Sequence, residues 1–472
     1  MIEVALIAVG AWLLYDYLKD LCWWIKGPTN WFGIGNSIEV FTHINTFLDW
    51  LLLKEKYNGT FTYKIIGIPR FVYLNDVKNV TYLLKDNFDN FVKGKFFQNN
   101  FEDLLGDGIF SMDGDKWRMQ RKAAAKIFHV HNFREHMIVV FNKHMNTVCN
   151  IAKTSKSFDF HAVMHQFTLD SFTEIGFGES VNSLHSKENK FATAFDGLQK
   201  MTNEKFLVPR VLIFLKNLFT NKMSLRAQYK KDIDSFSYQV IQRRLQLHSL
   251  DHEDLLSHFL RMQKENGETY LPQDLRNIVL NFIIAGRDTT AQALSWVVYE
   301  LKDYPEIISK IRKEIKENVK DVSYPTYEEI KSLSYTHATF MEVLRLHPSV
   351  PKNVKYAVKA CTFPDGTFVR AGWGVCWSPY AMARTKEIWG EDCCELKPER
   401  FLSENYDPNI NFSFHAGPRT CLGQQMAQLE AVGTMAMLYS QFDIKVLNKA
   451  TYNATITLQM KDPLMVQMTR IN

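Results

Sequence analysis

The sequence lacks any pair of cysteines in CxxC spacing, and its seven cysteines are scattered along 472 residues. An odd, scattered set argues against a disulfide framework and indicates a reducing compartment. Adjacent Cys393 and Cys394 suggest a zinc site with His415 and Cys421, but structural zinc sites use separated pairs of ligands. We therefore interpret Cys393 and Cys394 as structural or incidental residues.

The sequence also lacks a Ser/Gly linker, a low-complexity tract, an internal repeat and a strong net charge. A net charge of +5 is small for this length and argues against a nucleic-acid partner, which needs a concentrated basic face. The hydrophobic content of 46% is enough to bury a large core. Because nothing divides the chain, we predict one large domain over residues 27–472.

A run of ~20 apolar residues, the length that spans a bilayer as a helix, is missing as well. Residues 2–18 come nearest, but two acidic residues interrupt them. A tilted anchor, a signal peptide and an amphipathic surface helix all remain open. A signal peptide should begin with positive charge, whereas Lys19 and Lys26 follow the segment and would keep the body cytosolic by the positive-inside rule. We favour a membrane anchor over residues 1–26.

Helical periodicity dominates the chain after Val77. Before it, residues 60–66 and 70–74 are β-prone runs that predict a hairpin. Residues 362–376 and short segments near the C-terminus predict further strands. The expected fold class is therefore mainly α (α+β), with small sheets.

The stretch from Phe414 to Gly423 carries the strongest chemical signal. Cys421, as a thiolate, can bind a metal ion, and Gly417 and Gly423 let the backbone bend close to a flat ligand. Arg419 can reach a carboxylate at the edge of that ligand, and Phe414 can pack beneath the sulfur. A buried cysteine between a strand and a helix is the simpler alternative, but five positions at fixed spacing favour a proximal haem-thiolate loop.

On these residues the chain resembles the cytochrome P-450 superfamily of haem-thiolate monooxygenases, from about Gly27 to the C-terminus. The resemblance implies haem b, iron protoporphyrin IX, between a long central helix and the cysteine loop. It also implies that Trp117 and Arg121, one helical turn apart, bind a haem propionate. A packed tryptophan beside a solvated arginine is the alternative for that pair. Lys355 stands where many relatives place a propionate-binding arginine, and it keeps the charge without the bidentate fork.

Glu342 and Arg345 lie three residues apart on one predicted helix face. Alone they would form an ordinary pair that stabilises a helix by ~0.2–0.5 kcal/mol. The family resemblance adds Arg400 and implies a buried ion network. We assign these three residues a structural role, as a brace for the loop that carries Cys421.

The block from Ala285 to Thr290 interrupts a long apolar helix predicted over residues 277–301. Gly286 costs about 1 kcal/mol relative to alanine, and the Thr289 hydroxyl can bond the Ala285 carbonyl and bend the axis. We predict a local opening with exchangeable protons, in which Thr289 holds the oxygen and an ordered water and Asp288 relays protons from solvent. The alternative is a helix kink with a surface acid.

The segments 348–351, 363–369 and 388–392 resemble the plant and fungal fatty-acid and alkane ω-hydroxylase branch. The resemblance implies insertion of one oxygen atom of O2 into a C–H bond of a hydrophobic substrate, expected to be a fatty acid. A reductase-independent isomerase or peroxygenase and a non-catalytic haem carrier or sensor are the alternatives, and the pair Asp288 and Thr289 argues against both. Phe96, Phe97, Val350 and Leu458 are candidate lining residues, with core packing as their alternative.

No flavin or nicotinamide fingerprint follows Cys421, so the electrons must come from another chain. We expect NADPH as their source through a separate flavoprotein reductase, with a cytochrome b5-type protein as a further donor. The expected location is the endoplasmic reticulum membrane, with the catalytic domain on the cytosolic side. Residues 201–218 are expected to form the roof of the substrate cavity, at the membrane.

Overall fold

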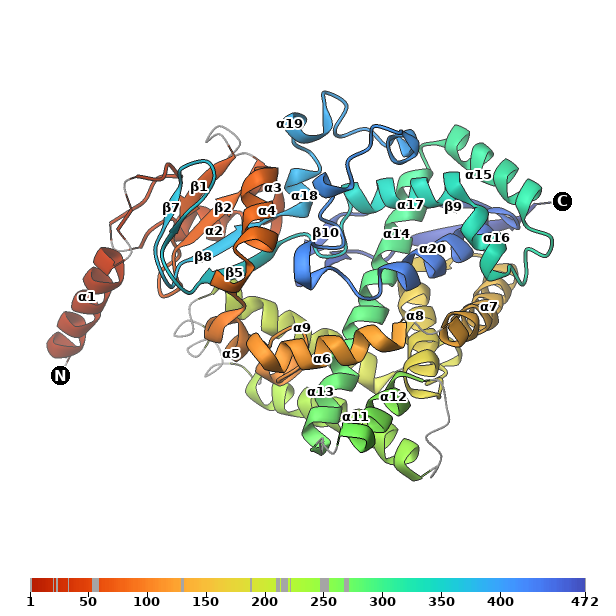
Figure 1. Ribbon diagram of the computed structural model, residues 1–472, viewed down its shortest axis with the longest axis horizontal. Helices are drawn as coiled ribbons and strands as arrows, with labels where there is room; N and C mark the ends of the chain where they lie inside the picture. The colour runs from red at the N-terminus through yellow and green to blue at the C-terminus, as the bar shows by residue number, and fades with distance from the viewer. Residues whose placement is uncertain are drawn as a thin grey trace.

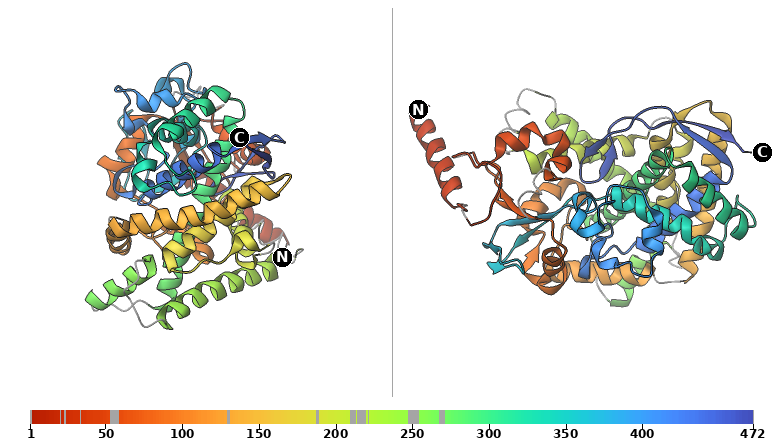
Figure 2. Two further views of the ribbon diagram at one scale, coloured as in Figure 1. Left: turned by 90° about the vertical axis from the view of Figure 1, so that its right-hand side faces the viewer. Right: turned by 90° about the horizontal axis from the view of Figure 1, so that it is seen from above.

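Helices dominate the computed structural model, and small sheets lie at one end and along one side of it (Figure 1). The model describes residues 2–19, 21–22, 24–32, 34–52, 59–128, 131–186, 189–208, 213, 220, 222–246, 254–266 and 271–471. The predicted mainly α (α+β) class is confirmed. In Figure 2 the helices stack in layers, with the green helices α11 and α12 on one side of the yellow helices α7 and α8.

The larger helices share the main body with several short ones. Their bounds are α5 Gly94–Leu105, α6 Gly114–Phe128, α7 His131–Thr154, α8 Phe160–Phe177, α9 Lys190–Leu207, α11 Lys222–Gln246, α12 Leu255–Asn266, α13 Pro272–Ile283, α14 Thr289–Leu301, α15 Pro305–Asn318, α17 Ser334–Leu346 and α20 Gln424–Tyr439. The short helices are α2 Ser37–Thr42, α3 Phe47–Leu52, α4 Val77–Thr81, α16 Tyr327–Ser332, α18 Pro379–Met382 and α19 Lys386–Trp389.

The largest described sheet joins segments from both halves of the chain. Its strands, in spatial order, are β1 Thr60–Tyr63, β2 Phe71–Leu74, β8 Gly374–Trp377, β5 Asn353–Ala357 and β3 Phe91–Val92. The predicted hairpin is confirmed as the antiparallel pair β1–β2, although β1 ends at Tyr63. Because β2 pairs in parallel with β8, a strand from the C-terminal half of the chain lies beside the N-terminal hairpin.

Smaller sheets complete the fold. They are formed by β6 Cys361–Thr362 with β7 Phe368–Val369, by β10 Tyr452–Ala454 with β11 Leu458–Met460, and by β4 Phe158–Asp159, β12 Met465–Arg470 and β9 Phe442–Val446. The pair β6–β7 lies within residues 362–376 as predicted, except that β6 starts one residue earlier.

The predicted central helix runs from α13 through a π turn, Ile284–Asp288, into α14. The Thr289 hydroxyl donates to the Ala285 carbonyl (2.6 Å), as predicted, and π turns of this kind often mark functional sites. A Cβ on Gly286 would lie 2.0 Å from the Phe172 ring of α8. Gly286 therefore serves close helix packing, and the π turn supplies the local opening.

The N-terminal helix α1, Ile2–Lys19, projects from the body in two views (Figures 1 and 2). Its last turn is docked, because Asp16 forms a buried ion pair with Lys64 (3.1 Å). Among the helices of the described residues, we find no candidate long and apolar enough to cross a bilayer. The anchor over residues 1–26 stays a prediction.

Candidate active site

The loop before α20 turns sharply at Gly417, which has a φ of +65°. A Cβ here would lie 2.1 Å from the Leu84 carbonyl oxygen, so only glycine fits. The turn is closed by a hydrogen bond from the Cys421 backbone N–H to the Phe414 carbonyl (2.9 Å). Gly423 has an ordinary φ of −85°, and a Cβ there would meet no described atom within 4 Å. The bend therefore belongs to Gly417, while Gly423 leaves room beside Cys421.

The Cys421 side chain is exposed, yet burial by the surrounding protein raises the pKa of its thiol. Two groups act against this effect of burial. The Gly423 backbone N–H and the charge of Arg121 both lower the thiol pKa. Arg121 is itself held by a hydrogen bond to the Thr420 carbonyl (2.6 Å). The loop thus offers an accessible sulfur with two partners for its negative charge, as a thiolate metal ligand requires.

Three cations, Lys93, Lys355 and Arg419, gather around the carboxylate of Asp113. Burial and the neighbouring cations lower the pKa of Lys355 to about 6 and that of Lys93 to about 7. The Lys355 Nζ lies 4.2 Å from the Phe88 ring centre and has no hydrogen-bond partner among the described residues. Buried cations in excess of acids cost free energy unless anions pair with them. The two propionates of haem b fit this cradle and would supply the negative charge.

Trp117 and Arg419 lie against each other at the same place. The Arg419 guanidinium is 4.4 Å from the Trp117 ring centre and donates to the Met112 carbonyl (2.7 Å) and to Asp113 (3.0 Å). Arg121 follows Trp117 by one turn of α6. The structure therefore brings the predicted cofactor residues together from α6, β5 and the cysteine loop, and it adds a contact of Arg121 with that loop. Their binding of propionates stays a prediction.

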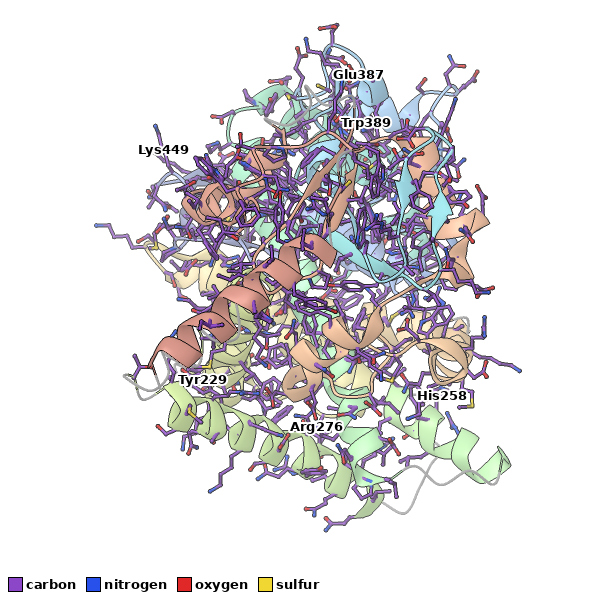
Figure 3. The ribbon with its side chains drawn as sticks, turned by 90° about the vertical axis from the view of Figure 1, so that its left-hand side faces the viewer. Tyr229, His258, Arg276, Glu387, Trp389 and Lys449 are labelled. Carbon is purple, nitrogen blue, oxygen red and sulfur yellow. The ribbon has the colours of Figure 1, made fainter. Side chains whose placement is uncertain are left out.

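The brace residues meet as the family resemblance implied. Glu342 and Arg345, both fully buried on α17, form two hydrogen bonds of 2.7 and 2.8 Å. Arg400 Nε lies 3.3 Å from Glu342, and Arg345 donates to the carbonyls of residues 383, 393 and 395. The Arg345 guanidinium also lies 4.6 Å from the ring centre of Trp389, which Figure 3 labels. Arg345 thus ties α17 to the segment that leads to the cysteine loop.

Thr289 and Asp288 point to different sides of the central helix. Thr289 and Ala285, one helical turn apart, are both half-buried. Asp288 and Thr290, on either side of Thr289 in the sequence, are fully buried. Thr290 hydrogen-bonds Glu430 of α20, so the helix that bears Thr289 contacts the helix that follows Cys421. Thr289 therefore lies on the accessible face.

Asp288 is not the surface acid of the alternative interpretation. Its side chain is fully buried among α8, α9 and the π turn, where it contacts Arg287 (3.0 Å). Burial raises its pKa to about 6, against the opposing charge of Arg287. The carboxyl can thus change its protonation state near neutral pH, which suits proton transfer.

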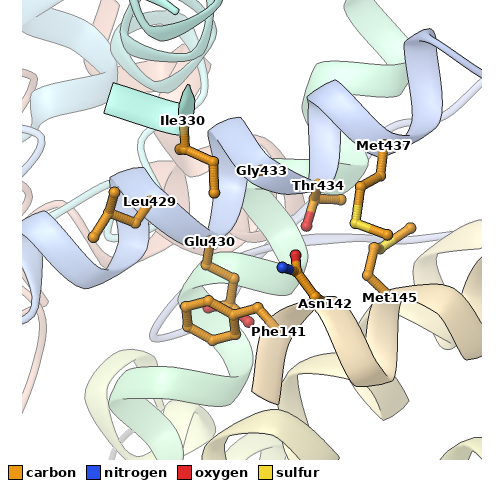
Figure 4. Close-up of a pocket in the computed structure, with 9 residues that line it drawn as sticks. All are labelled: Phe141, Asn142, Met145, Ile330, Leu429, Glu430, Gly433, Thr434 and Met437. Atoms are coloured by element: carbon orange, nitrogen blue, oxygen red, sulfur yellow. The ribbon is translucent and has the colours of Figure 1, made fainter. Parts of the chain in front are cut away.

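Sequence reasoning missed Lys93, His165 and Glu430. The residues around Lys93 and His165 form no motif that would indicate a functional site. Glu430, in contrast, is the one acid in the apolar run of residues 426–439. Glu430 is fully buried and borders a pocket of about 10 Å³, roughly the space of one water (Figure 4). Burial raises its pKa well above the usual value and so favours its neutral form.

The predicted lining residues separate into two groups. Phe96 and Phe97 contact the ring of Phe206 on α9 (5.9 and 5.8 Å between ring centres), under the predicted roof. Val350 is half-buried, whereas Leu458 is fully buried and belongs to the core. Of the predicted roof, residues 209–212 and 214–218 lie outside the described part.

The zinc alternative finds no support. Within the described ranges, no group of three or more His, Cys, Asp or Glu side chains is placed to hold a metal ion. The sulfurs of Cys393 and Cys394 lie 3.8 Å apart, and Cys393 donates to the Arg384 carbonyl (3.3 Å). The pair is part of the packing around the brace.

The chain is similar to known proteins over almost its whole length. The family model "Cytochrome P450" matches residues 25–467. Cytochrome P450 704B1 of Arabidopsis thaliana is 32% identical, covering 94% of this chain and 95% of the relative. Cytochrome P450 86B1 of the same plant is 35% identical over 87% and 79% of the two chains. Cytochrome P450 monooxygenase cyp1 of Mycosarcoma maydis is 30% identical over 94% and 75%.

Proposed function

Because this chain belongs to the cytochrome P450 family, as a monooxygenase with haem b and a redox partner, we propose that it hydroxylates fatty acids near their ω end. The balanced reaction takes RH, O2, NADPH and H+ to ROH, H2O and NADP+. The observation that carries the site assignment is the accessible Cys421 sulfur beside a cradle of surplus cations. Support for the substrate comes from the segments 348–351, 363–369 and 388–392 and from the aromatic cluster of Phe96, Phe97 and Phe206.

The haem, when bound, supplies the reductive activation of O2 and the transfer of one oxygen atom. The protein's own residues hold it and move protons. Cys421 would ligate the iron, and Lys355, Lys93 and Arg419 would pair with the propionates. Thr289 is placed to hold a water and pass protons by its hydroxyl on the accessible face of the central helix.

The proposed electron donor is a separate flavoprotein reductase that oxidises NADPH, with a cytochrome b5-type protein as a further donor. Arg118, on the same helix as Arg121, is more than half exposed and pairs with Asp89 and Asp115. An acidic donor surface can compete for such exposed ion pairs, because exposed pairs are weak.

The proposed location is the endoplasmic reticulum membrane, with the catalytic domain on the cytosolic side. Trp12, Leu14, Tyr15 and Leu18 of α1 are at least 44% exposed, and apolar side chains on a projecting helix suit insertion into a bilayer interface. Removing residues 2–19 should move the expressed protein from the microsomal pellet to the supernatant. Retention in the pellet would place the membrane contact elsewhere.

A reduced carbon-monoxide difference spectrum, followed by turnover of a saturated fatty acid with NADPH and reductase, tests the function. We expect a thiolate-type Soret band and an ω-hydroxylated product that needs the reductase. Full turnover of a hydroperoxide without reductase would favour the isomerase or peroxygenase alternative. A thiolate band without turnover of fatty acids or other hydrophobic substrates would favour a carrier or sensor.

A further inference from the structure

Asp288 is sealed from solvent by residues of three elements. Its carboxylate accepts hydrogen bonds from Arg287 Nη1 (3.0 Å) in the π turn and from the Gln199 side-chain amide on α9. The third neighbour is the Nδ1 of His165 on α8, 3.6 Å away and just outside hydrogen-bond distance. A proton that reaches Asp288 through these elements therefore passes one of these side chains or a water beside them.

Two of the three neighbours cannot pass a proton. Burial opposes the charge of Arg287, but the carboxylates of Asp196 and Asp288 outweigh it and raise the pKa of the guanidinium. A guanidinium so held does not release a proton at neutral pH. The amide of Gln199 does not titrate. The imidazole of His165 is the remaining group, and imidazole is the side chain best suited to accept a proton on one nitrogen and release it from the other.

His165 connects Asp288 to a second histidine. His161 lies one turn earlier on α8, with its ring edge-on to that of His165 at 4.6 Å between centres. The His161 Nδ1 lies 2.9 Å from the Ser295 hydroxyl of α14. His165 retains 12% side-chain exposure, whereas the Asp288 side chain has none.

The charges around His165 keep it neutral at rest. Burial, His161 and Arg287 lower its pKa well below the usual value. Burial lowers the pKa of His161. The carboxylates of Asp159, at the start of α8, and of Asp196, on α9, act against burial and raise this pKa. A neutral imidazole has one nitrogen free to accept the next proton.

Buried polar atoms without partners point to water at the same place. His165 Nδ1, Gln199 Oε1 and Arg287 Nε have no hydrogen-bond partner in the part of the chain that the structure describes. All three belong to residues that contact or approach Asp288. Buried polar groups of this kind are ordinarily satisfied by ordered water, which also conducts protons.

We propose that His165 delivers solvent protons to Asp288, as a relay residue that touches neither haem nor substrate. A proton binds Nε2 from water, the Nδ1–H bond breaks, and an O–H bond forms on Asp288 Oδ1. Asp288 then passes its proton toward Thr289. His165 is left as the neutral Nε2–H tautomer, and proton exchange with neighbouring water restores the Nδ1–H form, so charge and protons balance. This inference rests on the role proposed for Asp288 and Thr289.

The test compares His165→Gln with His144→Gln in the full-length haem-loaded enzyme with its reductase. His144 is a buried histidine on α7 that pairs with Glu174 (2.7 Å), away from Asp288, and it controls for loss of a buried imidazole. We expect His165→Gln to lower the product formed per NADPH roughly a hundredfold, the low end of what a proton-transfer group contributes, with an unchanged KM. The loss should be larger at pH 8 than at pH 6, because bulk acid substitutes for the relay.

A readout independent of turnover uses 15N-histidine spectra of the resting enzyme. Asp288→Asn should shift the His165 nitrogen resonances and leave those of His144 in place. An unshifted His165 resonance, or coupling within twofold of wild type at both pH values, overturns the relay. If Thr289→Ala also stays fully coupled, the role of the whole Asp288–Thr289 site fails. If Thr289→Ala uncouples and His165→Gln does not, the relay alone fails.

Discussion

Replacing Glu342 with alanine tests the buried network that braces the cysteine loop. Its carboxylate accepts hydrogen bonds from Arg345 (2.7 and 2.8 Å), the Lys397 backbone N–H (2.9 Å) and Arg400 (3.3 Å). Without it, the fully buried Arg345 guanidinium loses its counter-charge. Three backbone carbonyls still hold that guanidinium in place, so it cannot swing out to water.

The expected loss follows from the burial of both partners. Removing one partner of a buried ion pair typically costs about 3–5 kcal/mol, because the other charge stays buried and uncompensated. Arg400 adds little to this loss, because it still pairs with Asp392 (2.7 Å). The matched control is Glu317→Ala. Glu317 pairs with Lys313 at 4.0 Å on α15, both side chains are at least 60% exposed, and such pairs contribute about 0.3–0.5 kcal/mol.

The assay is urea unfolding of the haem-loaded enzyme, followed by the reduced carbon-monoxide band and by tryptophan fluorescence. Glu342→Ala should lose the thiolate-type band at a lower urea concentration than the one at which its tryptophan fluorescence changes, because the cysteine loop is released first. Glu317→Ala should match wild type by both probes. If the two variants lose stability within about 1 kcal/mol of each other, a margin above the error of such comparisons, the network is not a brace.

Three further predictions concern single side chains. Thr289→Ala should divert NADPH electrons from product to hydrogen peroxide, while Thr290→Ser keeps coupling, as measured by peroxide per NADPH. Lys355→Met should speed transfer of haem to apomyoglobin roughly tenfold through loss of a charge-assisted hydrogen bond, and Lys355→Arg should not; equal rates would place the propionates elsewhere. Burial raises the pKa of Glu430 above its unfolded value, so its folded form binds the extra proton and stability falls as pH rises past the unfolded pKa. Glu430→Gln should therefore melt higher than wild type at pH 8, with a smaller difference at pH 5; a constant difference would contradict a neutral Glu430.

Some sequence expectations needed correction for reasons that lie outside the local sequence. Gly286 suggested an opening in the helix, but it is needed because the Phe172 ring packs against it. Leu458 was a candidate lining residue, but its place in the core depends on β11 packing against α14, where its carbonyl accepts from Trp296 (3.1 Å). Neither contact leaves a trace in the residues nearby in sequence.

The sequence by itself determined the parts whose geometry is local. The turn around Gly417, the back-bond from Thr289 to Ala285 and the pairing of Glu342 with Arg345 all depend on spacings within one loop or helix turn, which backbone geometry dictates. That is why the residues of the cysteine loop and of the oxygen-activating block are enough to recognise both.

Only the tertiary structure decided which charges meet. Lys93 and Lys355 lie far apart in the sequence and become neighbours because β3 pairs with β5 in one sheet. His165 approaches Asp288 because α8 packs against the π turn. Such contacts depend on how whole elements pack, and packing depends on many apolar side chains at once, so no short motif encodes them.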